Sequence, residues 1–389
     1  MNAENLLNER AKELKQGSIR AMFDKANTMQ NVISMGIGEP DLHTPAPICQ
    51  ACADALMNGF THYTPNAGFP KLREAVSKYC FDVPGLYDPA TEIIITNGGM
   101  GALSLLMLVI LQPGDQVLIQ DPQWLNYAAQ IKYCGGEPVG VPTTAEHNFT
   151  MTAEDIRKCY VPGKTKALII NSPNNPTGEV MERAEMEKIA KLACELDLLV
   201  ISDEVYNTLL YEGAEALSIS SFPGMKERTA VINSFSKSYA MTGWRVGFTA
   251  APAPLVRRMT MLQENFNSCV NAAAQMGAVY ALEHPELKNE LIESLAERRQ
   301  IALEGIRAIP GMKCNAPKGA FYLFPDITAY GMSSVEFCNR LLDEAGVVCI
   351  PGSAFGSCGE GYIRLSYTAK KDDLIEAMDR MKKFCQRYI

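Results

Sequence analysis

The sequence predicts an α/β protein in which helices cover a mainly parallel, doubly wound sheet of seven strands, with a smaller α+β domain beside it. Through the middle of the chain, short apolar runs rich in β-branched residues alternate with helical patterns. Most of these runs are apolar on both faces, as expected of strands that helices cover on each side. The seven runs are 92–96, 116–120, 137–141, 166–171, 198–203, 230–235 and 246–250.

Helical patterns fill the gaps between the runs. Residues 182–196 (ERAEMEKIAKLACEL) place apolar side chains at helical spacing. The longest apolar stretch, 102–111, includes Ser104 and is about half as long as a membrane span. We therefore expect a buried helix there.

The pattern changes after residue 285. Residues 287–309 form one long amphipathic pattern without an internal helix breaker. GAFYLFP, VVCIPG and GYIRLSY then follow as short alternating strands separated by helices. We expect a large domain over 45–285 and a small α+β domain made from both chain ends, 1–44 and 286–389.

Composition narrows the classes of function. A net charge of −8 and a pI near 5.3 disfavour nucleic-acid binding, which needs a basic face. Residues 1–16 are charged and helix-like and show no secretory signal, so we expect a cytoplasmic protein. Among twelve cysteines and four histidines, only Cys49 and Cys52 form a C-x-x-C pair, and the sequence contains no second C-x-x-C pair that could complete a zinc site. We expect free thiols and no metal site.

Ligands bind to open α/β sheets at the carboxyl ends of the strands, and polar segments follow several of the predicted strands. Residues 97–101 (NGGMG) make a glycine-rich turn that opens a helix. The backbone amides of such a turn can bind a phosphate group, or the glycines have only the structural role of allowing the chain to turn. Residues 172–178 (SPNNPTG) form a rigid polar loop, which belongs to a site or is an ordinary turn.

Two ionisable residues occupy the same kind of position. Asp203 ends a buried strand, where a carboxylate needs a partner such as a protonated ring nitrogen, or else caps a helix. Lys237 follows the run 230–235 and precedes Thr242-Gly243-Trp244-Arg245. A lysine there is either functional or a solvated surface residue, so these residues taken singly leave the function open.

Six elements of the chain occur together in an order known from one enzyme family. They are HYTPNAGFPKLREAV, TNGGMGAL, NSPNNPTG, SDEVY, SFSKSYAMTGWRVGF and GYIRLSY. The set resembles the class I/II aminotransferases, pyridoxal-phosphate enzymes of fold type I, and especially their aspartate/aromatic subgroup. The resemblance covers nearly the whole chain, from GEPD (38–41) onward. Its most specific part is S-K-x5-G-x-R-x-G, with Lys237, Gly243, Arg245 and Gly247.

The resemblance implies pyridoxal 5′-phosphate as cofactor, held by Lys237 as a Schiff base. Lys237 would also shuttle a proton between the substrate Cα and the cofactor. Asp203 would keep the pyridine nitrogen protonated, while Tyr206 and Asn175 would hydrogen-bond the phenolic oxygen. Trp124 would stack on the pyridine face; otherwise it is an interface or core tryptophan.

The resemblance also implies where the phosphate and a second chain would lie. Tyr63 would reach the phosphate of the neighbouring subunit, which implies a homodimer with shared active sites. Arg245 would act as a fork to the phosphate dianion. The full phosphate shell would be Gly99, Met100, Gly101, Ser234, Ser236 and Arg245.

For the substrate, the resemblance implies that Arg364 binds the α-carboxylate in a bidentate pair, or else is a surface strand arginine. The backbone near Gly38 would close over the same carboxylate, with Asn175 and Trp124 beside it. The reaction implied is transfer of the amino group of an L-amino acid to a 2-oxo acid by a ping-pong mechanism.

Two positions depart from relatives. Met100 stands where some aspartate-preferring relatives have a lysine for the second carboxylate, and Gly101 stands where a glutamine is more usual. With Ile37, Trp124 and Tyr127 as possible walls, we expect aromatic or apolar amino donors and 2-oxoglutarate as a tolerated acceptor. Still open are a dedicated aspartate aminotransferase, a carbon–sulfur β-lyase with the same cofactor, and a cofactor-binding regulatory module without turnover.

Overall fold

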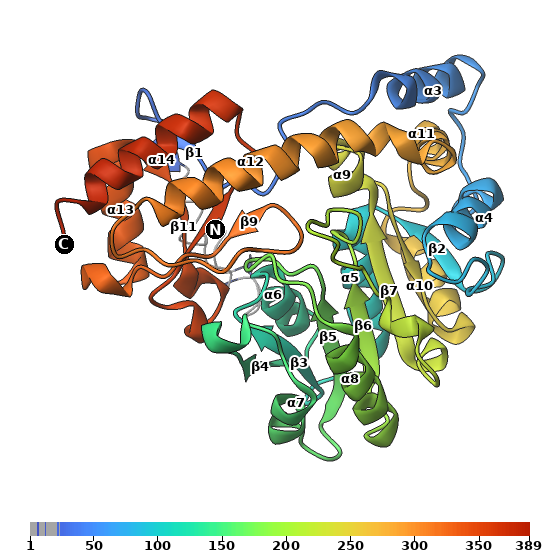
Figure 1. The fold of residues 1–389 in the computed structure, drawn as a ribbon. Coiled ribbons are helices and arrows are strands. Elements are labelled where there is room, and N and C mark those ends of the chain that lie inside the picture. The colour runs from blue at the N-terminus through green and yellow to red at the C-terminus, as the bar shows by residue number, and fades with distance from the viewer. Residues whose placement is uncertain (1–5, 8–11, 13–21, 23) are drawn as a thin grey trace.

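The computed structural model describes residues 6–7, 12, 22 and 24–389. The helix expected within residues 1–16 therefore lies almost entirely outside the described residues. A seven-stranded sheet forms the centre of the molecule, in the order β2-β8-β7-β6-β5-β3-β4 (Figure 1). Its strands are β2 (Ile93–Thr96), β3 (Gln116–Asp121), β4 (Glu137–Pro142), β5 (Thr165–Asn171), β6 (Leu199–Asp203), β7 (Thr229–Ser234) and β8 (Gly247–Ala250).

Each predicted run became a strand whose ends lie within one residue of the prediction, which confirms the α/β fold class. The strands of the sheet are parallel except β8, which runs antiparallel to both β2 and β7. The central strands are buried over most of their length, and β7 is buried at every position. Helices on both faces exclude water from them.

Successive side chains along a strand point to opposite faces of the sheet and pack into different hydrophobic cores. On one face, Ile94 and Ile232 pack with α5 (Gly98–Ile110) and α10 (Ala253–Phe266). On the other, Ile93 and Val231 pack with α4 (Pro70–Tyr79) and α11 (Ala272–Glu283).

Further helices cover the rest of the sheet. Helix α3 (Ala46–Met57) lies against α11, and α6 (Asn126–Tyr133) lies against β4. The β4 half of the second face is covered by α7 (Ala153–Cys159) and α8 (Arg183–Glu195). The helix predicted over 182–196 is α8, shortened by one residue at each end.

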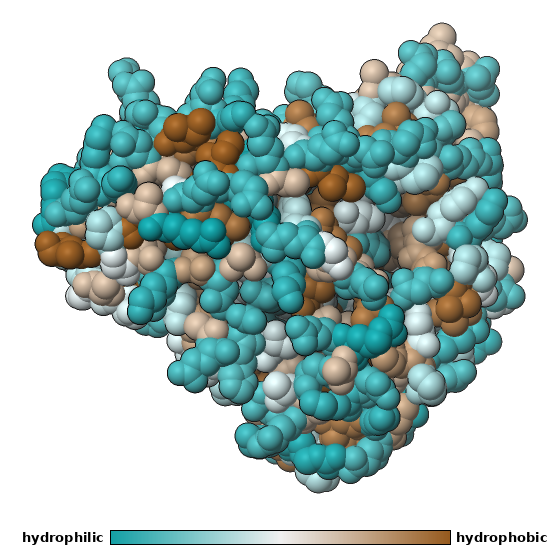
Figure 2. Space-filling view, in the orientation of Figure 1, coloured by the Kyte–Doolittle hydropathy of each residue, from teal (hydrophilic) through white to brown (hydrophobic). Residues whose placement is uncertain are grey.

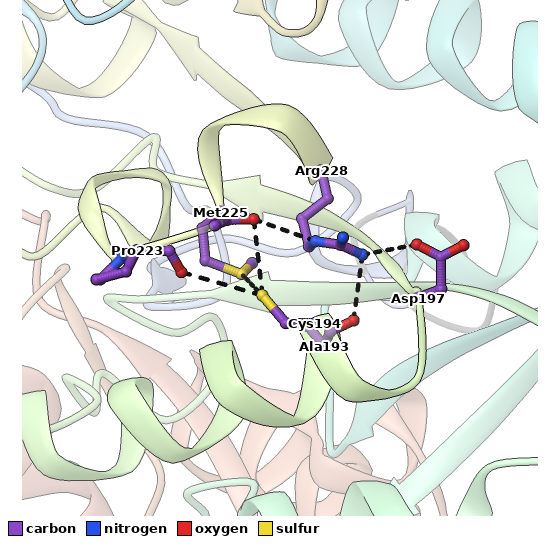
Figure 3. A network of polar contacts seen from close by, with 7 residues as sticks. Ala193, Cys194, Asp197, Pro223, Met225 and Arg228 are labelled. Carbon is purple, nitrogen blue, oxygen red and sulfur yellow. Dashed lines mark hydrogen bonds and ion pairs between the residues drawn. The ribbon is translucent and has the colours of Figure 1, made fainter.

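The segment that leads into β7 is attached to the end of α8 (Figure 3). Arg228 donates from Nη1 to Asp197 Oδ1 at 2.9 Å and to the Ala193 carbonyl at 3.4 Å, and from Nε to the Gly224 carbonyl at 3.1 Å. Cys194 Sγ lies 3.8 Å from Met225 Sδ. These contacts hold the start of β7, whose far end enters the site described below.

The C-terminal part builds two small sheets. Strands β11 (Ile350–Pro351), β12 (Ile363–Ser366) and β9 (Tyr322–Leu323) form an antiparallel sheet in that order, and β1 (Ile33–Ser34) pairs in parallel with β10 (Val347–Val348). The run VVCIPG is thus two strands in different sheets, because the chain leaves one partner and meets another around Cys349. Helices α13 (Ser334–Ala345) and α14 (Lys371–Cys385) cover these sheets.

The long helix predicted over 287–309 is α12 (Asn289–Arg307). It begins later than predicted because residues Pro285–Lys288 form a separate 3-10 turn. Figure 1 shows α12 crossing from the C-terminal sheets to the end of α11. Met22, Ala26 and Met35 share a core with the C-terminal elements. The division into a large domain over 45–285 and a small domain made of 1–44 and 286–389 stays a prediction.

Hydrophilic side chains cover most of the face in Figure 2, and hydrophobic ones are scattered among them. Within the described part of the chain, no helix combines the length and apolarity that a membrane crossing needs. The described histidine, cysteine and acidic side chains also form no group of three that could hold a metal ion.

Candidate active site

A cavity of about 380 Å³ opens at the carboxyl end of the sheet. Its lining comes from the N-terminus of α5, the segments after β3, β5, β6 and β7, the stretch 37–39, and strands β9 and β12. Parallel strands deliver their carboxyl ends to one edge, so residues far apart in sequence meet there. Of the site residues predicted from sequence, the lining includes Gly38, Gly99, Met100, Trp124, Asn175, Asp203, Tyr206, Ser234, Ser236, Lys237, Arg245 and Arg364.

Lys237 lies on α9 (Phe235–Ser238), a single helical turn directly after β7. Ser234 caps this turn by accepting a hydrogen bond from the Ser236 amide. Lys237 Nζ donates to the Gly38 carbonyl at 2.6 Å and lies 5.9 Å from the centre of the Phe321 ring. Burial lowers the pKa of Lys237 to about 8, although the Glu39 carboxylate opposes this. A larger fraction of the amine is therefore neutral near pH 7 than for an exposed lysine.

Asp203 ends β6, and its carboxylate is fully enclosed. Tyr127 Oη donates to Asp203 Oδ2 at 2.5 Å, and the Val205 amide donates to Oδ1 at 3.3 Å. Burial raises the pKa of Asp203 to about 6, while these two hydrogen bonds lower it. Neither donor carries a positive charge, so the carboxylate has no cationic partner among the described residues.

Tyr206, Tyr322 and Asn175 form a hydrogen-bonded group beside Asp203. The two phenol oxygens are 2.8 Å apart, and Asn175 Nδ2 lies 3.5 Å from each. Burial raises the pKa of both Tyr206 and Tyr322, so both phenols are neutral at pH 7. One of the two hydroxyl protons lies in the bond between them, so the other can be donated to an oxygen in the cavity.

Arg364 is buried on β12, between the rings of Tyr322 and Phe355, whose centres lie 4.6 and 5.0 Å from its Cζ. It donates from Nη1 to Asn175 Oδ1 at 3.1 Å and from Nη2 to the Gly36 carbonyl at 2.6 Å, and Nε has no partner in the part of the chain that the structure describes. Burial lowers its pKa. No described carboxylate lies within ion-pair distance of this guanidinium, which leaves it free to bind an anion.

The stretch 36–41 is held close to these residues by its own contacts. Asp41 Oδ1 accepts from Arg298 Nη1 at 2.6 Å, and Glu39 accepts from the Thr242 hydroxyl. Gly38 lies against Tyr322 so closely that a Cβ at this position would sit 2.3 Å from the phenol oxygen. Only glycine fits there, which brings the Gly38 backbone up to Lys237.

The other end of the cavity suits an anion. The first amides of α5, from Asn97 to Met100, have no acceptor within the helix. A Cβ on Gly98 would lie only 2.4 Å from Arg245 Nη2, so the Arg245 guanidinium packs directly on this turn. The Ser234 and Ser236 hydroxyls are 2.8 Å apart and line the same end.

The structure places one member of the predicted phosphate shell away from the cavity. Gly101 is the fourth residue of α5, so its amide donates to the Asn97 carbonyl within the helix and is not free. It does not line the cavity. The amides without an acceptor in the helix are those of Asn97, Gly98, Gly99 and Met100, and of these residues Gly99 and Met100 line the cavity.

Trp124 and Met100 form part of the cavity wall. The Trp124 ring meets the Tyr127 ring edge-on, with centres 5.2 Å apart. Met100 Sδ lies 3.3 Å from Gln130 Nε2 and 3.7 Å from Asn126 Nδ2. Tyr63 lies between α3 and α4, is 88% exposed and does not line the cavity, so its predicted role requires a second chain.

The contacts of two residues in the site are not indicated by the sequence. The sequence predicts Tyr127 only as a wall of the cavity, yet Tyr127 is a direct partner of Asp203. Tyr322 lies in the predicted strand GAFYLFP, and no local pattern indicates that its hydroxyl meets Tyr206 or that its ring lies against Arg364. Both contacts join elements that are far apart in the sequence.

These observations fit pyridoxal phosphate. Its protonated ring nitrogen matches the unpaired carboxylate of Asp203, and its phosphate matches the free amides of α5 with Arg245. Its aldehyde matches a buried amine with a lowered pKa, and its phenolic oxygen matches the donors Tyr206 and Asn175. A mainly parallel α/β sheet with such a cavity at its carboxyl edge defines a pyridoxal-phosphate enzyme of fold type I.

Comparison with known proteins agrees with this class. The family model "Aminotransferase class I and II" matches residues 30–381. The chain is 42% identical to aromatic-amino-acid aminotransferase 2 of Thermococcus litoralis and to the aspartate aminotransferase of Pyrococcus abyssi, each over 97% of both chains. It superposes on the aromatic aminotransferase structure from Pyrococcus horikoshii with a TM-score of 0.88 and 41% identity, over 94% of this chain and 99% of that one. The chain belongs to the class I and II aminotransferase family and is a pyridoxal-phosphate-dependent aminotransferase.

Proposed function

We propose that this protein moves the amino group of an aromatic or medium-sized apolar L-amino acid to a 2-oxo acid, with 2-oxoglutarate as an accepted acceptor. The observation that carries the proposal is the single cavity onto which the Lys237 amine, the Asp203 carboxylate and the Arg364 guanidinium all face. Relatives bearing the names aromatic and aspartate aminotransferase support the subgroup.

The residues named above would hold the cofactor by its charged groups. Asp203 would pair with the ring nitrogen, and the free amides of α5 with Ser234, Ser236 and Arg245 would hold the phosphate. When bound, pyridoxal phosphate supplies an electron sink that stabilises negative charge on the substrate Cα. Tyr127 would keep the Asp203 carboxylate ionised by donating to Oδ2.

Lys237 would act as the covalent anchor and as the proton carrier at the substrate Cα. A pKa of about 8 lets its nitrogen both release and accept a proton near neutral pH. The Gly38 carbonyl, which accepts from Nζ at 2.6 Å, keeps the amine at the mouth of the cavity once it is free. Burial of the amine also limits its exchange of protons with bulk water.

Arg364 would fix the α-carboxylate of every substrate. Its Nη1 and Nη2 are already oriented by Asn175 and Gly36, and Nε remains unpartnered. A guanidinium held flat between two rings presents a planar fork to a carboxylate. Substrates are therefore α-amino and α-oxo acids.

The preferred side chain of the substrate follows from the cationic residues that line the cavity. Lys237, Arg245 and Arg364 are the only cationic residues among the described ones that line the cavity, and each already has a role. Met100, Trp124 and Ile37 present apolar or aromatic surface instead. A second substrate carboxylate would find no dedicated cation there, which favours aromatic and apolar donors.

A panel of amino donors tests this substrate class. Values of kcat/KM should be measured for phenylalanine, methionine, alanine and aspartate with 2-oxoglutarate and with pyruvate. We expect phenylalanine or methionine to lead. An aspartate lead above about a hundredfold, or roughly 2.7 kcal/mol of preferential transition-state binding, contradicts the role of Met100. Release of pyruvate from cystathionine faster than amino transfer would favour a β-lyase.

The anchor is tested separately. Borohydride reduction of the holoenzyme should fix one cofactor per chain, and peptide mapping should find it on Lys237. Lys237→Ala should lose this linkage and nearly all turnover with an unchanged circular dichroism spectrum. Exposed Lys164→Ala serves as the control and should behave as wild type. Fixation on another lysine would overturn the site assignment.

We also propose a homodimer with shared active sites. Large apolar side chains are exposed together in the α3–α4 segment, at Met57, Phe60 and Tyr63, and such exposure is typical of an interface. A tyrosine that is 88% exposed there can serve a site only in another chain. Sedimentation should give a dimer, and Tyr63→Phe should raise the cofactor Kd about tenfold to a hundredfold. A fully active monomer would contradict this proposal.

A further inference from the structure

A second cavity, of about 240 Å³, opens on the α4/α11 face of the sheet. Its lining comes from the ends of α4 and α11, the turn Pro285–Lys288, the segment after β6, and the end of β7. Ser234 is the one residue that lines both this cavity and the active-site cavity. The transamination site described above therefore leaves this space without a role.

The polar part of the second cavity contains one positively charged residue, Lys288. Lys288 is half-buried, and its ammonium has no ion pair or hydrogen bond with any described residue. Burial lowers its pKa, as expected for an ammonium that lost water without gaining a partner. An anion in the cavity would supply the missing partner.

Asn233 gives a second, independent indication. Its side chain is only 7% exposed and lines the cavity. Its Oδ1 accepts from the Ser234 amide at 2.7 Å, which orients the side chain, and its two Nδ2 protons have no acceptor among the described residues. These protons are available to an oxygen of a ligand in the cavity.

The apolar part of the lining indicates that the ligand also has an apolar part. Phe235, Phe248 and Leu282 form an apolar wall, and none of the described residues that line the cavity is acidic. An inorganic anion would leave this wall uncovered, whereas a ring or branched chain would cover it.

We propose that the second cavity binds a small organic carboxylate, with its apolar body against Phe235, Phe248 and Leu282 and its carboxylate on Lys288 and Asn233. The Thr208 hydroxyl donates to Ser238 Oγ at 2.8 Å, so the Ser238 proton is free to turn toward the same carboxylate. Because Asn233 also holds the Ser234 amide, the ligand contacts a residue that is directly bonded to the active-site lining.

Benzoate is a suitable probe because it has a ring and a carboxylate but neither an amino nor an oxo group. Titration calorimetry should use the Arg364→Ala holoenzyme, since Arg364 would otherwise bind benzoate in the active-site cavity. We expect one benzoate per chain. Adding Lys288→Met should weaken binding at least about tenfold, the loss expected for one charge-assisted hydrogen bond. Adding Lys288→Arg should keep binding within about threefold, because the charge remains.

Lys71→Met is the matched control, because Lys71 is an exposed lysine on α4 that lies outside the cavity. It should leave the benzoate Kd unchanged. A wild-type crystal soaked in benzoate should show the ring between Phe235 and Leu282. Benzoate binding that Lys288→Met does not weaken, or an empty second cavity in the soaked crystal, would refute the proposal. Inorganic phosphate binding more tightly than benzoate would refute the organic ligand class.

Discussion

Tyr127 Oη donates a hydrogen bond of 2.5 Å to Asp203 Oδ2, joining α6 to the end of β6 in the floor of the active-site cavity. The bond lowers the pKa of Asp203 against the opposing effect of burial, which raises it to about 6. Tyr127 is therefore a positioning residue: it acts on the cofactor through the carboxylate.

Tyr127→Phe should leave Asp203 with a higher pKa and a weaker hold on the ring nitrogen. We expect the cofactor Kd to rise about tenfold to a hundredfold, the range for a hydrogen bond to a charged group. The acidic limb of the kcat/KM profile should also move to higher pH. Tyr133→Phe, an exposed tyrosine on the same helix, is the control. An unchanged pH profile would assign Tyr127 a purely structural role.

Arg364→Lys keeps a positive charge but removes the planar fork that lies between Tyr322 and Phe355. We expect kcat/KM to fall at least about a hundredfold for every amino donor, because every donor carries the α-carboxylate. Steady-state kinetics with four donors measures this. Arg340→Lys, on the exposed face of α13, should have no effect. A loss restricted to one donor would mean that Arg364 reads the side chain instead.

Met100→Lys should bring a cation to the wall of the cavity, where Met100 is 37% exposed. The ratio of kcat/KM for aspartate over phenylalanine should rise by about tenfold to a hundredfold, because a second carboxylate then gains an ionic partner. Met100→Gln has a similar length without the charge and should change the ratio little. Equal ratios in the two variants would remove Met100 from substrate selection.

Glu204 offers a test of stability against pH. It is buried beside Asp203, and its Oε1 accepts from Ser218 Oγ at 2.6 Å and from Ser202 Oγ at 2.8 Å. Burial raises its pKa to about 7, although both hydrogen bonds lower it. The folded state therefore binds this proton more tightly than the unfolded state, whose glutamate has a pKa near 4.3.

The free energy of unfolding should consequently fall as pH rises from about 4.5 to 7, by up to about 3 kcal/mol from this group alone. Glu204→Gln cannot titrate and should lose this part of the pH dependence. Urea unfolding of both holoenzymes at pH 5 and pH 7.5 measures the difference. Parallel pH dependences in wild type and variant would show that Glu204 does not titrate in this window.

Much of the fold follows from local patterns. Buried strands such as β5 and β7 are continuous apolar runs, because helices cover both of their faces, and the runs identified all seven strands. The antiparallel direction of β8 and the division of VVCIPG between two sheets were beyond such patterns. Strand direction and partner depend on which segments pack together, and periodicity does not encode that.

The candidate site divides in the same way. Asp203, Lys237 and the glycine turn before α5 each follow a strand, so their meeting at one edge of the sheet was predictable from the sequence alone. Only the tertiary structure revealed the Tyr127–Asp203 bond, the bond between the Tyr322 and Tyr206 hydroxyls, and the Gly38 carbonyl on Lys237. It also decided that the Gly101 amide is used inside α5. The physical reason is distance along the chain: a strand and the turn after it are set by neighbouring residues, whereas these hydrogen bonds join segments that only the packed core brings within 3 Å.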